Sequence, residues 1–366
     1  MAILSYLIWN GSPELYEIGS ILGSDPIILR WYGLFFALGF LITQQILYYI
    51  FKKEGKPEKD VDTLTIYMVV ATIIGARLGH VIFYEPDRYL DHPLRIFNVM
   101  EGGLASHGAT IAILLALWIY ARKKKPAQNY LQTLDRIVIL VALASSLIRV
   151  GNFFNSEIIG KPTDKSWGVV FVNRLTNHLE KNPNVEIVQY TKSDRTEETA
   201  ESDKPVNLYI FFKPGVTEGQ ADYLLADDVN AQLSGDMSEF FRGGLTYSIQ
   251  KLENGRYAAR ARIIGIARHP AQLYESLSHL ALFILLYALW IYYKRDLPDG
   301  RLLGIFLMFC FGSRFLLEFL KENQVSFENN MPLNMGQILS IPLILAGVFV
   351  FIQSFRKKET DRKKGE

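Results

Sequence analysis

Seven long apolar runs, separated by shorter polar segments, are the dominant pattern along the chain. Each run is about 20 residues long, the length that an α-helix needs to cross a hydrocarbon layer roughly 30 Å thick. Each is also apolar on every side, unlike a helix that packs one face on a soluble core. The pattern therefore predicts an all-α polytopic membrane protein with seven transmembrane helices. They are expected at roughly residues 31–51, 63–84, 106–121, 137–154, 271–293, 302–320 and 333–355.

The distribution of Lys and Arg among the loops predicts the orientation in the membrane. Eighteen basic residues lie in the loops 52–62, 122–136 and 294–301 and in the C-terminal tail, whereas only three lie in the opposite segments. Because positive residues stay on the cytoplasmic side, we expect the N-terminus outside and the C-terminus inside. The start of the chain lacks a basic region and a small-residue cleavage site, so we expect the first span to be an uncleaved anchor.

A polar stretch at 156–268 separates the fourth span from the fifth and is expected outside the membrane. It divides the chain into an N-terminal part with four spans (1–155), an extracytoplasmic insert (156–268), and a C-terminal part with three spans and a basic tail (269–366). The insert contains a variable segment at about 174–265, which has the alternating patterns of a small α+β unit.

Local signals place elements within this α+β unit. Thr217 and Gln220 have the spacing of a capping box, which begins a helix that runs to about Leu233. Asn254-Gly255 lies between two alternating runs and predicts a β-hairpin. The run VNLYIFFK is a further strand, and the charged run at 192–204 is a flexible loop.

Composition excludes several classes of protein. The chain has 366 residues, of which 49% are hydrophobic, and 39 Lys and Arg against 37 Asp and Glu give a net charge of +2. That charge builds no basic face for nucleic acid. Cys310 is the only cysteine and lies inside an apolar run, so neither a disulfide framework nor a CxxC site is expected. No GxSxG nucleophile motif and no HExxH metal motif are present, and we expect neither a metal nor another cofactor.

Polar side chains inside or at the ends of the spans carry the functional signal. An arginine at mid-helix costs about 2.5–3.5 kcal/mol on insertion scales, so each one requires an explanation. By the expected topology, five separate segments place such groups at one depth, towards the outer leaflet. The groups are Tyr32, Arg77 with His80, His107, Arg149 with Asn152 and Asn155, and Arg314 with Glu318.

Each of these residues taken alone also has a structural interpretation. Arg314 and Glu318, four residues apart, can pair on one helix face and hold two helices together. Arg77 and Arg149 can extend to the interface, His80 can be a packed histidine, and the glycines of the spans can permit close helix packing. These separate interpretations do not explain why all five segments place polar groups at the same depth in the membrane. Arginines gathered in the outer leaflet favour a phospholipid headgroup as the bound anion, and His107 is a candidate base.

Several motifs resemble those of the prolipoprotein diacylglyceryl transferase family. The run RVGNFFNSE from Arg149 to Glu157, continuing to Gly160, is similar to the signature of that family. Three positions depart from the pattern: Ile148 stands where a glycine is usual, Ala109 replaces the second glycine after His107, and Cys310-Phe311 replace an aromatic hydroxyl before Arg314. The segment at about 174–265 resembles nothing in the family. The other matching motifs are RWYGL, GARLGHVIFY, GGLASHG, GKPTDKSWGVVF, HPAQLYE, RFLLEF and MGQILSIP.

The resemblance implies transfer of a diacylglyceryl group from phosphatidylglycerol to a cysteine thiol. The cysteine would belong to the lipobox at the end of a prolipoprotein signal peptide, the product would be a thioether, and glycerol phosphate would leave. This is the first step of bacterial lipoprotein maturation. The resemblance implies catalytic roles for His107, Arg149 and Arg314. It implies substrate-binding roles for Tyr32, Arg77, Asn152, Asn155, Glu157, Gly160, Glu275 and Glu318.

The same resemblance implies a location and a set of partners. We expect a multi-pass protein of the bacterial cytoplasmic (inner) membrane with its active site towards the outer leaflet. Its partners would be phosphatidylglycerol, prolipoprotein signal peptides and membrane lipids, with no nucleic acid, and its oligomeric state is left open. Two other classes compete with this interpretation: an anionic-lipid transporter or flippase, and a membrane-anchored binding module that works through the insert.

Overall fold

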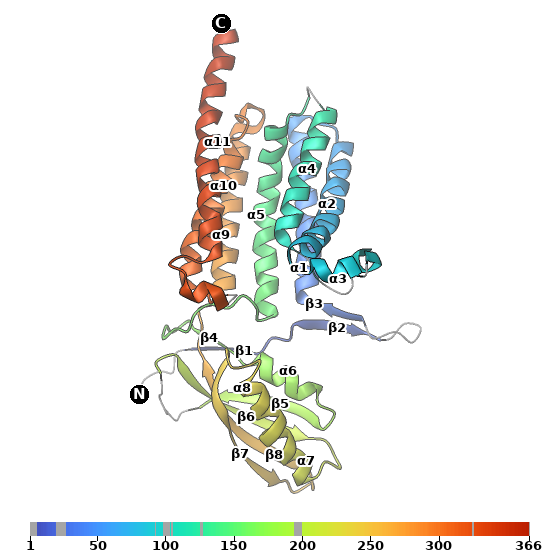
Figure 1. Ribbon diagram of the computed structural model, residues 1–366, viewed down its shortest axis with the longest axis vertical. Helices are drawn as coiled ribbons and strands as arrows, with labels where there is room; N and C mark the ends of the chain where they lie inside the picture. The colour runs from blue at the N-terminus through green and yellow to red at the C-terminus, as the bar shows by residue number, and fades with distance from the viewer. Residues whose placement is uncertain are drawn as a thin grey trace. The chain divides into compact units, whose positions relative to one another are not determined.

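The computed structural model describes residues 6–19, 27–91, 93–97, 103, 105–124, 127–193, 200–323 and 326–365. It divides into two compact units, each built from segments far apart in the sequence. Unit 1 comprises Met1–Phe36, Ile148–Ser276 and Leu316–Gln337, and unit 2 comprises Ala37–Leu147, Leu277–Phe315 and Ile338–Glu366. Unit 2 is helical, whereas unit 1 contains the sheets and the ends of several long helices (Figure 1).

Six helices in the described residues are long and apolar enough to cross a membrane. They correspond to six of the seven predicted spans. They are α1 (Trp31–Glu54), α2 (Lys59–Phe83), α5 (Tyr130–Phe154), α9 (Ala271–Tyr293), α10 (Arg301–Leu317) continued by the short helix η5 (Glu318–Leu320), and α11 (Met335–Gly365), of which Met335–Phe355 is the apolar part. Shorter helices α3 (Pro86–Asp91), η1 (Pro93–Phe97) and η4 (Lys294–Asp296) connect them.

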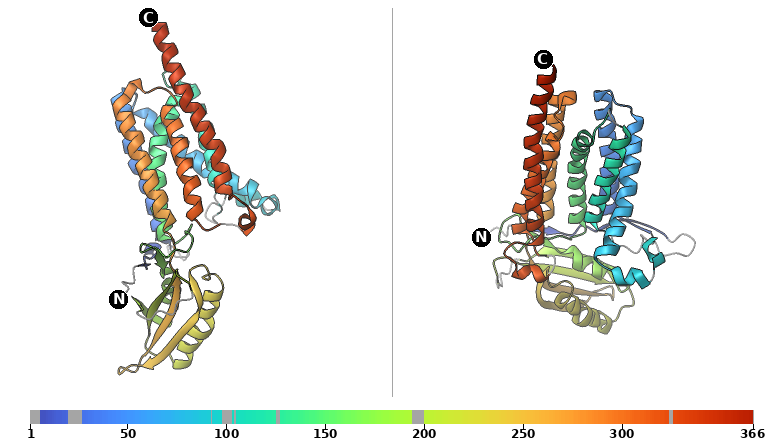
Figure 2. Two further views of the ribbon diagram at one scale, coloured as in Figure 1. Left: turned by 90° about the vertical axis from the view of Figure 1, so that its left-hand side faces the viewer. Right: turned by 45° about the horizontal axis from the view of Figure 1, so that its top comes forward.

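The predicted span at 106–121 forms helix α4 (Ser106–Lys124) but is not one of these six. Its apolar stretch is short, because His107 lies in its first turn and Arg122, Lys123 and Lys124 occupy its last turn. Six of the seven expected helices of spanning length are therefore present in the described residues. Figures 1 and 2 show α4 running beside α2 along most of its length.

Glycines bring α2 and α4 into backbone contact. A Cβ atom added at Gly75 would lie 2.6 Å from the carbonyl oxygen of Gly108, and one added at Gly79 would lie 2.7 Å from the Gly108 Cα. Gly75 and Gly79 are four residues apart, the small-residue spacing that permits close helix crossing in membranes. The packing role expected for these two glycines is thus confirmed, whereas a Cβ at Gly33 would meet nothing within 4 Å.

We expect Gly79→Ala to lower the stability of the protein in detergent. The added methyl group would have to displace the backbone of Gly108, and overpacking of this kind costs about 1–3 kcal/mol. The measurement is the midpoint of thermal unfolding. Gly312→Ala in α10 is the matched control, because a Cβ there meets nothing within 4 Å. Equal midpoints for the two variants would show that the α2–α4 contact is not tight.

The centre of the insert is a four-stranded antiparallel sheet with strand order β5-β6-β8-β7. Its strands are β5 (Val185–Lys192), β6 (Asp203–Phe212), β7 (Phe241–Lys251) and β8 (Tyr257–Ile266), and its helices are α6 (Asn173–Lys181), α7 (Glu218–Tyr223), η3 (Leu224–Val229) and α8 (Asn230–Ser234). Alternate residues of the two central strands, such as Leu208 and Ala261, are fully buried against Leu175 of α6 and Leu225 of η3. The helices therefore cover one face of the sheet.

The α+β pattern expected for the insert agrees with these elements. Thr217 and Gln220 form the capping box through reciprocal hydrogen bonds, and the helical run that follows ends at Ser234. Gly255, at φ 81°, turns the chain between β7 and β8. Strand β6 contains the VNLYIFFK run except its last residue, Lys213. Of the charged run at 192–204, residues 194–199 lie outside the described residues.

The strands near the N-terminus belong to unit 1 and were not expected. β1 (Leu7–Trp9) pairs in parallel with β4 (Val169–Phe171), and β2 (Glu14–Ile18) pairs with β3 (Ile27–Arg30). The Trp9 ring lies 4.5 Å from Phe153 and 5.1 Å from Phe154, and Trp31 lies 4.9 Å from Phe154. These aromatic contacts anchor the C-terminal end of α5, which carries the first candidate site residues.

Candidate active site

The last two turns of α5 present Arg149 and Asn152 on one helix face. The two residues are three positions apart, so their side chains are neighbours. One terminal nitrogen of Arg149, Nη1, donates to Oδ1 of Asn152 at 3.1 Å. Asn152 is buried, at 5% exposure, whereas the Arg149 side chain is 24% exposed. The arginine is thus held at its inner side and accessible at its outer side.

The chain beyond α5 turns back through two strained residues that flank Glu157. Ser156 and Ile158 have φ values of 51° and 58°, in the left-handed region that β-branched and other side chains rarely adopt. The turn directs the Glu157 carboxylate back towards the helix, where Oε1 accepts from Nδ2 of Asn152 at 2.7 Å and from Nδ2 of Asn155 at 3.3 Å. Backbone strain of this kind concentrates at functional sites.

The first turns of α9 supply the acidic partner of Arg149. Oε2 of Glu275 lies 2.6 Å from Nε of Arg149, and the glutamate is 4% exposed. One turn earlier, the Gln272 side-chain amide donates to the backbone oxygen of Glu157 at 2.7 Å. Helix α9 therefore fixes both the arginine and the strained turn. Arg149 thus forms an ion pair through Nε and a hydrogen bond through Nη1.

A buried lysine continues the chain of charges. Nζ of Lys321 lies 3.1 Å from Oε1 of Glu275 and 3.0 Å from Oε1 of Glu318, and all three side chains are at most 7% exposed. The second oxygen of Glu318 accepts from Asn334 at 3.1 Å. Arg149, Glu275, Lys321 and Glu318 thus alternate in sign. We call these four residues, with Asn152 and Glu157, the Arg149 cluster.

Gly160 lies where three backbone segments meet. Its N–H donates to the carbonyl oxygen of His269, its own carbonyl accepts from Arg268, and it bridges to Lys321. A Cβ atom at this position would lie 2.4 Å from the His269 oxygen and 2.9 Å from that of Leu320. The glycine therefore permits the close approach that brings Lys321 to the cluster. Burial lowers the pKa of the His269 imidazole below its usual range, which favours the neutral form near pH 7.

Tyr32, in the first turn of α1, packs against the same end of α5. A Cβ atom at Gly151 would lie 3.0 Å from the Tyr32 Cα and 3.1 Å from its ring. Gly151 precedes Asn152, so the tyrosine lies next to the residue that holds Arg149. Seven of the eleven predicted site residues are thus brought together in unit 1, and an eighth, Gly160, shapes the backbone there.

The other three predicted site residues belong to unit 2, and Arg77 of α2 is the most buried of them at 3% exposure. Its guanidinium donates to the backbone oxygens of Arg95 at 2.6 Å, Ile96 at 2.9 Å and Gly103 at 3.4 Å, and stacks 5.0 Å from the Tyr89 ring. These contacts bind Arg77 to the segment around η1. They favour the structural interpretation over direct binding of substrate.

His107 and Arg314 are the two predicted catalytic residues in unit 2. His107 is an exposed residue in the first turn of α4, with its ring 5.0 Å from Phe83 and 5.8 Å from Tyr84. Arg314 is exposed on α10. The interpretation of His80 as a packed histidine agrees with its stacking on Tyr84.

Comparison with known families identifies the class of protein. The chain matches the family model described as "Prolipoprotein diacylglyceryl transferase" over residues 20–353. The chain belongs to the prolipoprotein diacylglyceryl transferase family. It therefore transfers the diacylglyceryl group of phosphatidylglycerol to prolipoproteins, the first step of lipoprotein maturation, and a transporter function is not favoured.

Relatives of similar length support the assignment. The chain is 34% identical over 361 residues to the phosphatidylglycerol–prolipoprotein diacylglyceryl transferase of Chloroherpeton thalassium, with 98% of both chains covered. It is 33% identical to that of Tolumonas auensis over 96% of this chain and 99% of the relative. It is 32% identical to that of Porphyromonas gingivalis, with 99% of both covered. These alignments span nearly the whole chain, so they include the insert.

Three residues of this transferase that contribute to the site were missed in the sequence: Lys321, Gln272 and Asn334. Lys321 had been counted only as one of the few basic residues outside. Its spacing of three residues from Glu318 was a visible signal for pairing. Gln272 and Asn334 carried no comparable signal, because their partners are distant in the sequence. In the described ranges, no group of three His, Cys, Asp or Glu side chains is arranged to hold a metal ion.

Proposed function

We propose that the Arg149 cluster binds the phosphate of phosphatidylglycerol while the lipobox cysteine of a prolipoprotein attacks the lipid. The observation that supports this proposal is the set of contacts and the partial exposure of the Arg149 guanidinium. Glu275 and Asn152 hold its Nε and Nη1 atoms, and the side chain remains 24% exposed, so an anion can reach the guanidinium. Guanidinium groups bind phosphate through strong charge-assisted hydrogen bonds and stay charged when partly desolvated.

The reaction is a substitution at the glycerol carbon that carries the phosphate ester. The cysteine thiol loses its proton, the sulfur forms a bond to this carbon, and the bond from the carbon to the phosphate oxygen breaks. The products are a thioether and glycerol phosphate. Negative charge moves from sulfur to the phosphate oxygen, so a positioned arginine stabilises the transition state more than the ground state. The free thiol has a pKa of about 8.5, so a base that removes its proton accelerates the reaction.

The remaining assignments rest on the sequence motifs. We propose His107 as the general base and Arg314 as a second arginine for the phosphate, with Glu318 orienting Arg314. Tyr32, Asn155 and Glu157 would position the headgroup and the peptide. The hydrogen bonds of Asn152 and Glu157 support roles in holding Arg149 and the strained turn.

The membrane arrangement is part of the proposal. Six apolar helices and the family show a multi-pass membrane protein. We propose that α4 is a seventh span despite its short apolar stretch, with the N-terminus and the insert (156–268) outside the bacterial inner membrane and the basic tail inside. The excess of Lys and Arg in the loops on one side supports this orientation. The active site then lies towards the outer leaflet.

The direct test uses purified full-length protein, phosphatidylglycerol and a synthetic lipobox peptide. We expect mass spectrometry to show the peptide gaining one diacylglyceryl group at its cysteine. A matched peptide with serine in place of that cysteine is the control and should stay unmodified. Modification of the serine peptide at the same rate would contradict the proposed nucleophile.

His107→Gln tests the assignment of the base. Removal of a general base lowers the rate by typically 10²–10⁴-fold, and the loss should shrink as pH rises towards the pKa of the thiol, because more thiolate forms without help. The measurement is the initial rate with the lipobox peptide between pH 6 and about 9. A loss that is the same at every pH would assign His107 to positioning instead. A rate equal to that of the unchanged protein would remove it from the mechanism.

A further inference from the structure

The four-stranded sheet of the insert has one face that no described helix covers. Val206, Leu208 and Ile210 of β6 are fully buried under α6, α7 and α8, whereas Asn207 and Tyr209 alternate with them and point to the opposite side. Strand β8 alternates in the same way. A half-exposed antiparallel sheet normally carries a mixture of polar and charged side chains on its solvent face.

Two rows of hydrogen-bonding side chains cross this open face. In the first row, Asn207 pairs with Arg262 and Arg262 pairs with Thr246. In the second row, Tyr209 pairs with Arg260 and Arg260 pairs with Ser248. Each row therefore has an arginine at its centre with an uncharged donor or acceptor on both sides. Directly opposite residues on one face are in reach of each other.

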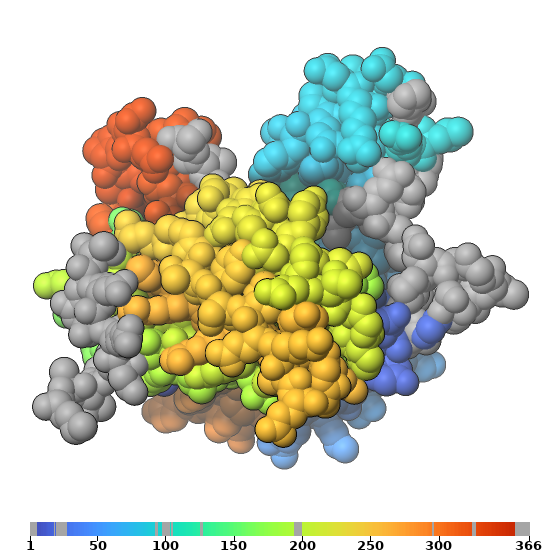
Figure 3. Space-filling view, turned by 90° about the horizontal axis from the view of Figure 1, so that it is seen from below, coloured from blue at the N-terminus to red at the C-terminus, as the bar shows by residue number. Residues whose placement is uncertain are grey.

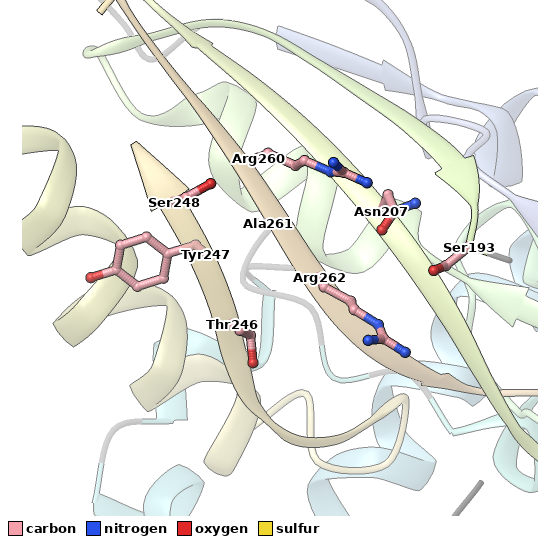
Figure 4. Close-up of a pocket in the computed structure, with 8 residues that line it drawn as sticks. All are labelled: Ser193, Asn207, Thr246, Tyr247, Ser248, Arg260, Ala261 and Arg262. Atoms are coloured by element: carbon pink, nitrogen blue, oxygen red, sulfur yellow. The ribbon is translucent and has the colours of Figure 1, made fainter. Parts of the chain in front are cut away.

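These rows border a hollow of about 490 Å³ in the open face. Figure 4 shows the guanidinium groups of Arg260 and Arg262 extending from β8 on the side of Asn207, whereas the Tyr247 ring points in the other direction. Among the described residues that line the hollow, none is acidic. They are Ser193, Asn207, Thr246, Tyr247, Ser248, Arg260, Ala261 and Arg262. Figure 3 shows the surface that the insert presents when the molecule is seen from below.

Two carboxylates of the same sheet form ion pairs with arginines that are not among the described lining residues. Asp203 lies 2.9 Å from Arg242, and Glu186 lies 2.6 Å from Arg256. Neither acid lines the hollow. Arg260 is exposed, and its guanidinium lies 6.0 Å from the Tyr209 ring, which supports it from one side. Arg260 therefore gives the hollow a positive charge beside neutral hydrogen-bonding side chains, and an anion complements it.

We propose that this hollow binds a phosphate-bearing polyol, with glycerol phosphate as the ligand that the reaction itself supplies, either free or as the headgroup of phosphatidylglycerol. The guanidinium of Arg260 would bind the phosphate oxygens in the manner that arginine forks favour. Ser248, Thr246 and Asn207 would hydrogen-bond the hydroxyl groups of the polyol. The insert would thereby have a ligand site separate from the Arg149 cluster.

The test is calorimetric titration of the purified full-length protein, in a neutral detergent, with glycerol 3-phosphate. We expect Arg260→Gln to lower the affinity for glycerol 3-phosphate at one class of site at least about tenfold. Arg260→Lys should lower this affinity less, because lysine keeps the charge but loses the forked pair of donors. Arg256→Gln is the matched control on the same sheet, since Arg256 does not line the hollow. Any glycerol 3-phosphate that the Arg260→Gln variant still binds is assigned to the active site. The transferase rate of this variant at saturating substrates should equal that of the unchanged protein.

Further titrations distinguish the sources of the ligand. A short-chain phosphatidylglycerol that binds when free glycerol 3-phosphate does not would identify the lipid headgroup as the ligand, and the reverse would identify the released product. Short-chain phosphatidylcholine should not bind in either case. Inorganic phosphate that competes equally with glycerol 3-phosphate would overturn the role of the polyol. The absence of saturable binding, or an equal loss in Arg256→Gln, would overturn the site itself.

Discussion

Replacing Arg149 with alanine is expected to lower the transferase rate by roughly 10²–10³-fold, the usual effect of removing one group that stabilises developing negative charge. The variant loses the donor to the leaving phosphate and also leaves Glu275, at 4% exposure, without its closest cation partner. The measurement is the initial rate of lipobox-peptide modification at saturating phosphatidylglycerol. Arg149→Lys should recover only part of the rate, because an ammonium group cannot reach Glu275, Asn152 and a phosphate at once.

Arg256→Ala provides the control for general effects of removing an arginine from unit 1. Arg256 pairs with Glu186 on the surface of the insert, and exposed ion pairs of this kind contribute little. Its rate should equal that of the unchanged protein. If Arg149→Ala also kept the full rate, the Arg149 cluster would not be the catalytic site, although the chain would still belong to the family.

Lys321→Met should strongly destabilise the folded protein. Lys321 is the buried cation between Glu275 and Glu318, and removing one partner from a buried charged group costs about 3–5 kcal/mol. With the usual dependence of melting temperature on stability, the thermal midpoint should fall by roughly 10 °C. Lys321→Arg should retain most of the stability, because the guanidinium keeps a positive charge between the two carboxylates.

Two further variants separate the charge effect from a loss of packing. Lys165→Met removes an exposed lysine beside Asp164 and should change the midpoint little. The double variant Lys321→Met with Glu318→Gln removes one cation and one anion together, so it should be more stable than the sum of the single changes predicts. Additive effects would mean that Lys321 acts through packing of its carbon chain and not through its charge.

The structural elements best predicted from the sequence were those that a repeating pattern of apolar residues encodes. Apolar runs of spanning length and the alternation within the insert identified six spanning helices and the strands β6, β7 and β8. The α4 helix was located correctly, but it is not among the helices of spanning length, because His107 lies in its first turn and basic residues occupy its last turn. Strands β1 and β3 escaped prediction, since each is short and is defined by its pairing partner.

The structure brings together those candidate site residues that lie in one motif. The run from Arg149 to Glu157 folds on itself, so its internal hydrogen bonds follow from local spacing. Contacts between distant segments were harder to predict. The pairing of Arg149 with Glu275 and the insertion of Lys321 between two glutamates depend on how three chain segments meet at Gly160, and no periodic pattern encodes that meeting.

The two left-handed residues beside Glu157 set a limit on how this enzyme can be made more robust. Each such residue stores about 1–3 kcal/mol of conformational strain. Glycine would release this strain at Ile158, whereas glycine at Ser156 would also remove the buried hydrogen bond from the serine hydroxyl to Oδ1 of Asn173. A search for heat-resistant variants would therefore favour glycine at Ile158. The same change would let the turn adopt several backbone conformations, and the Glu157 carboxylate would no longer be held in one orientation. Thermal stability and turnover are thus opposed at Ile158, and selection for stability alone is expected to lower turnover.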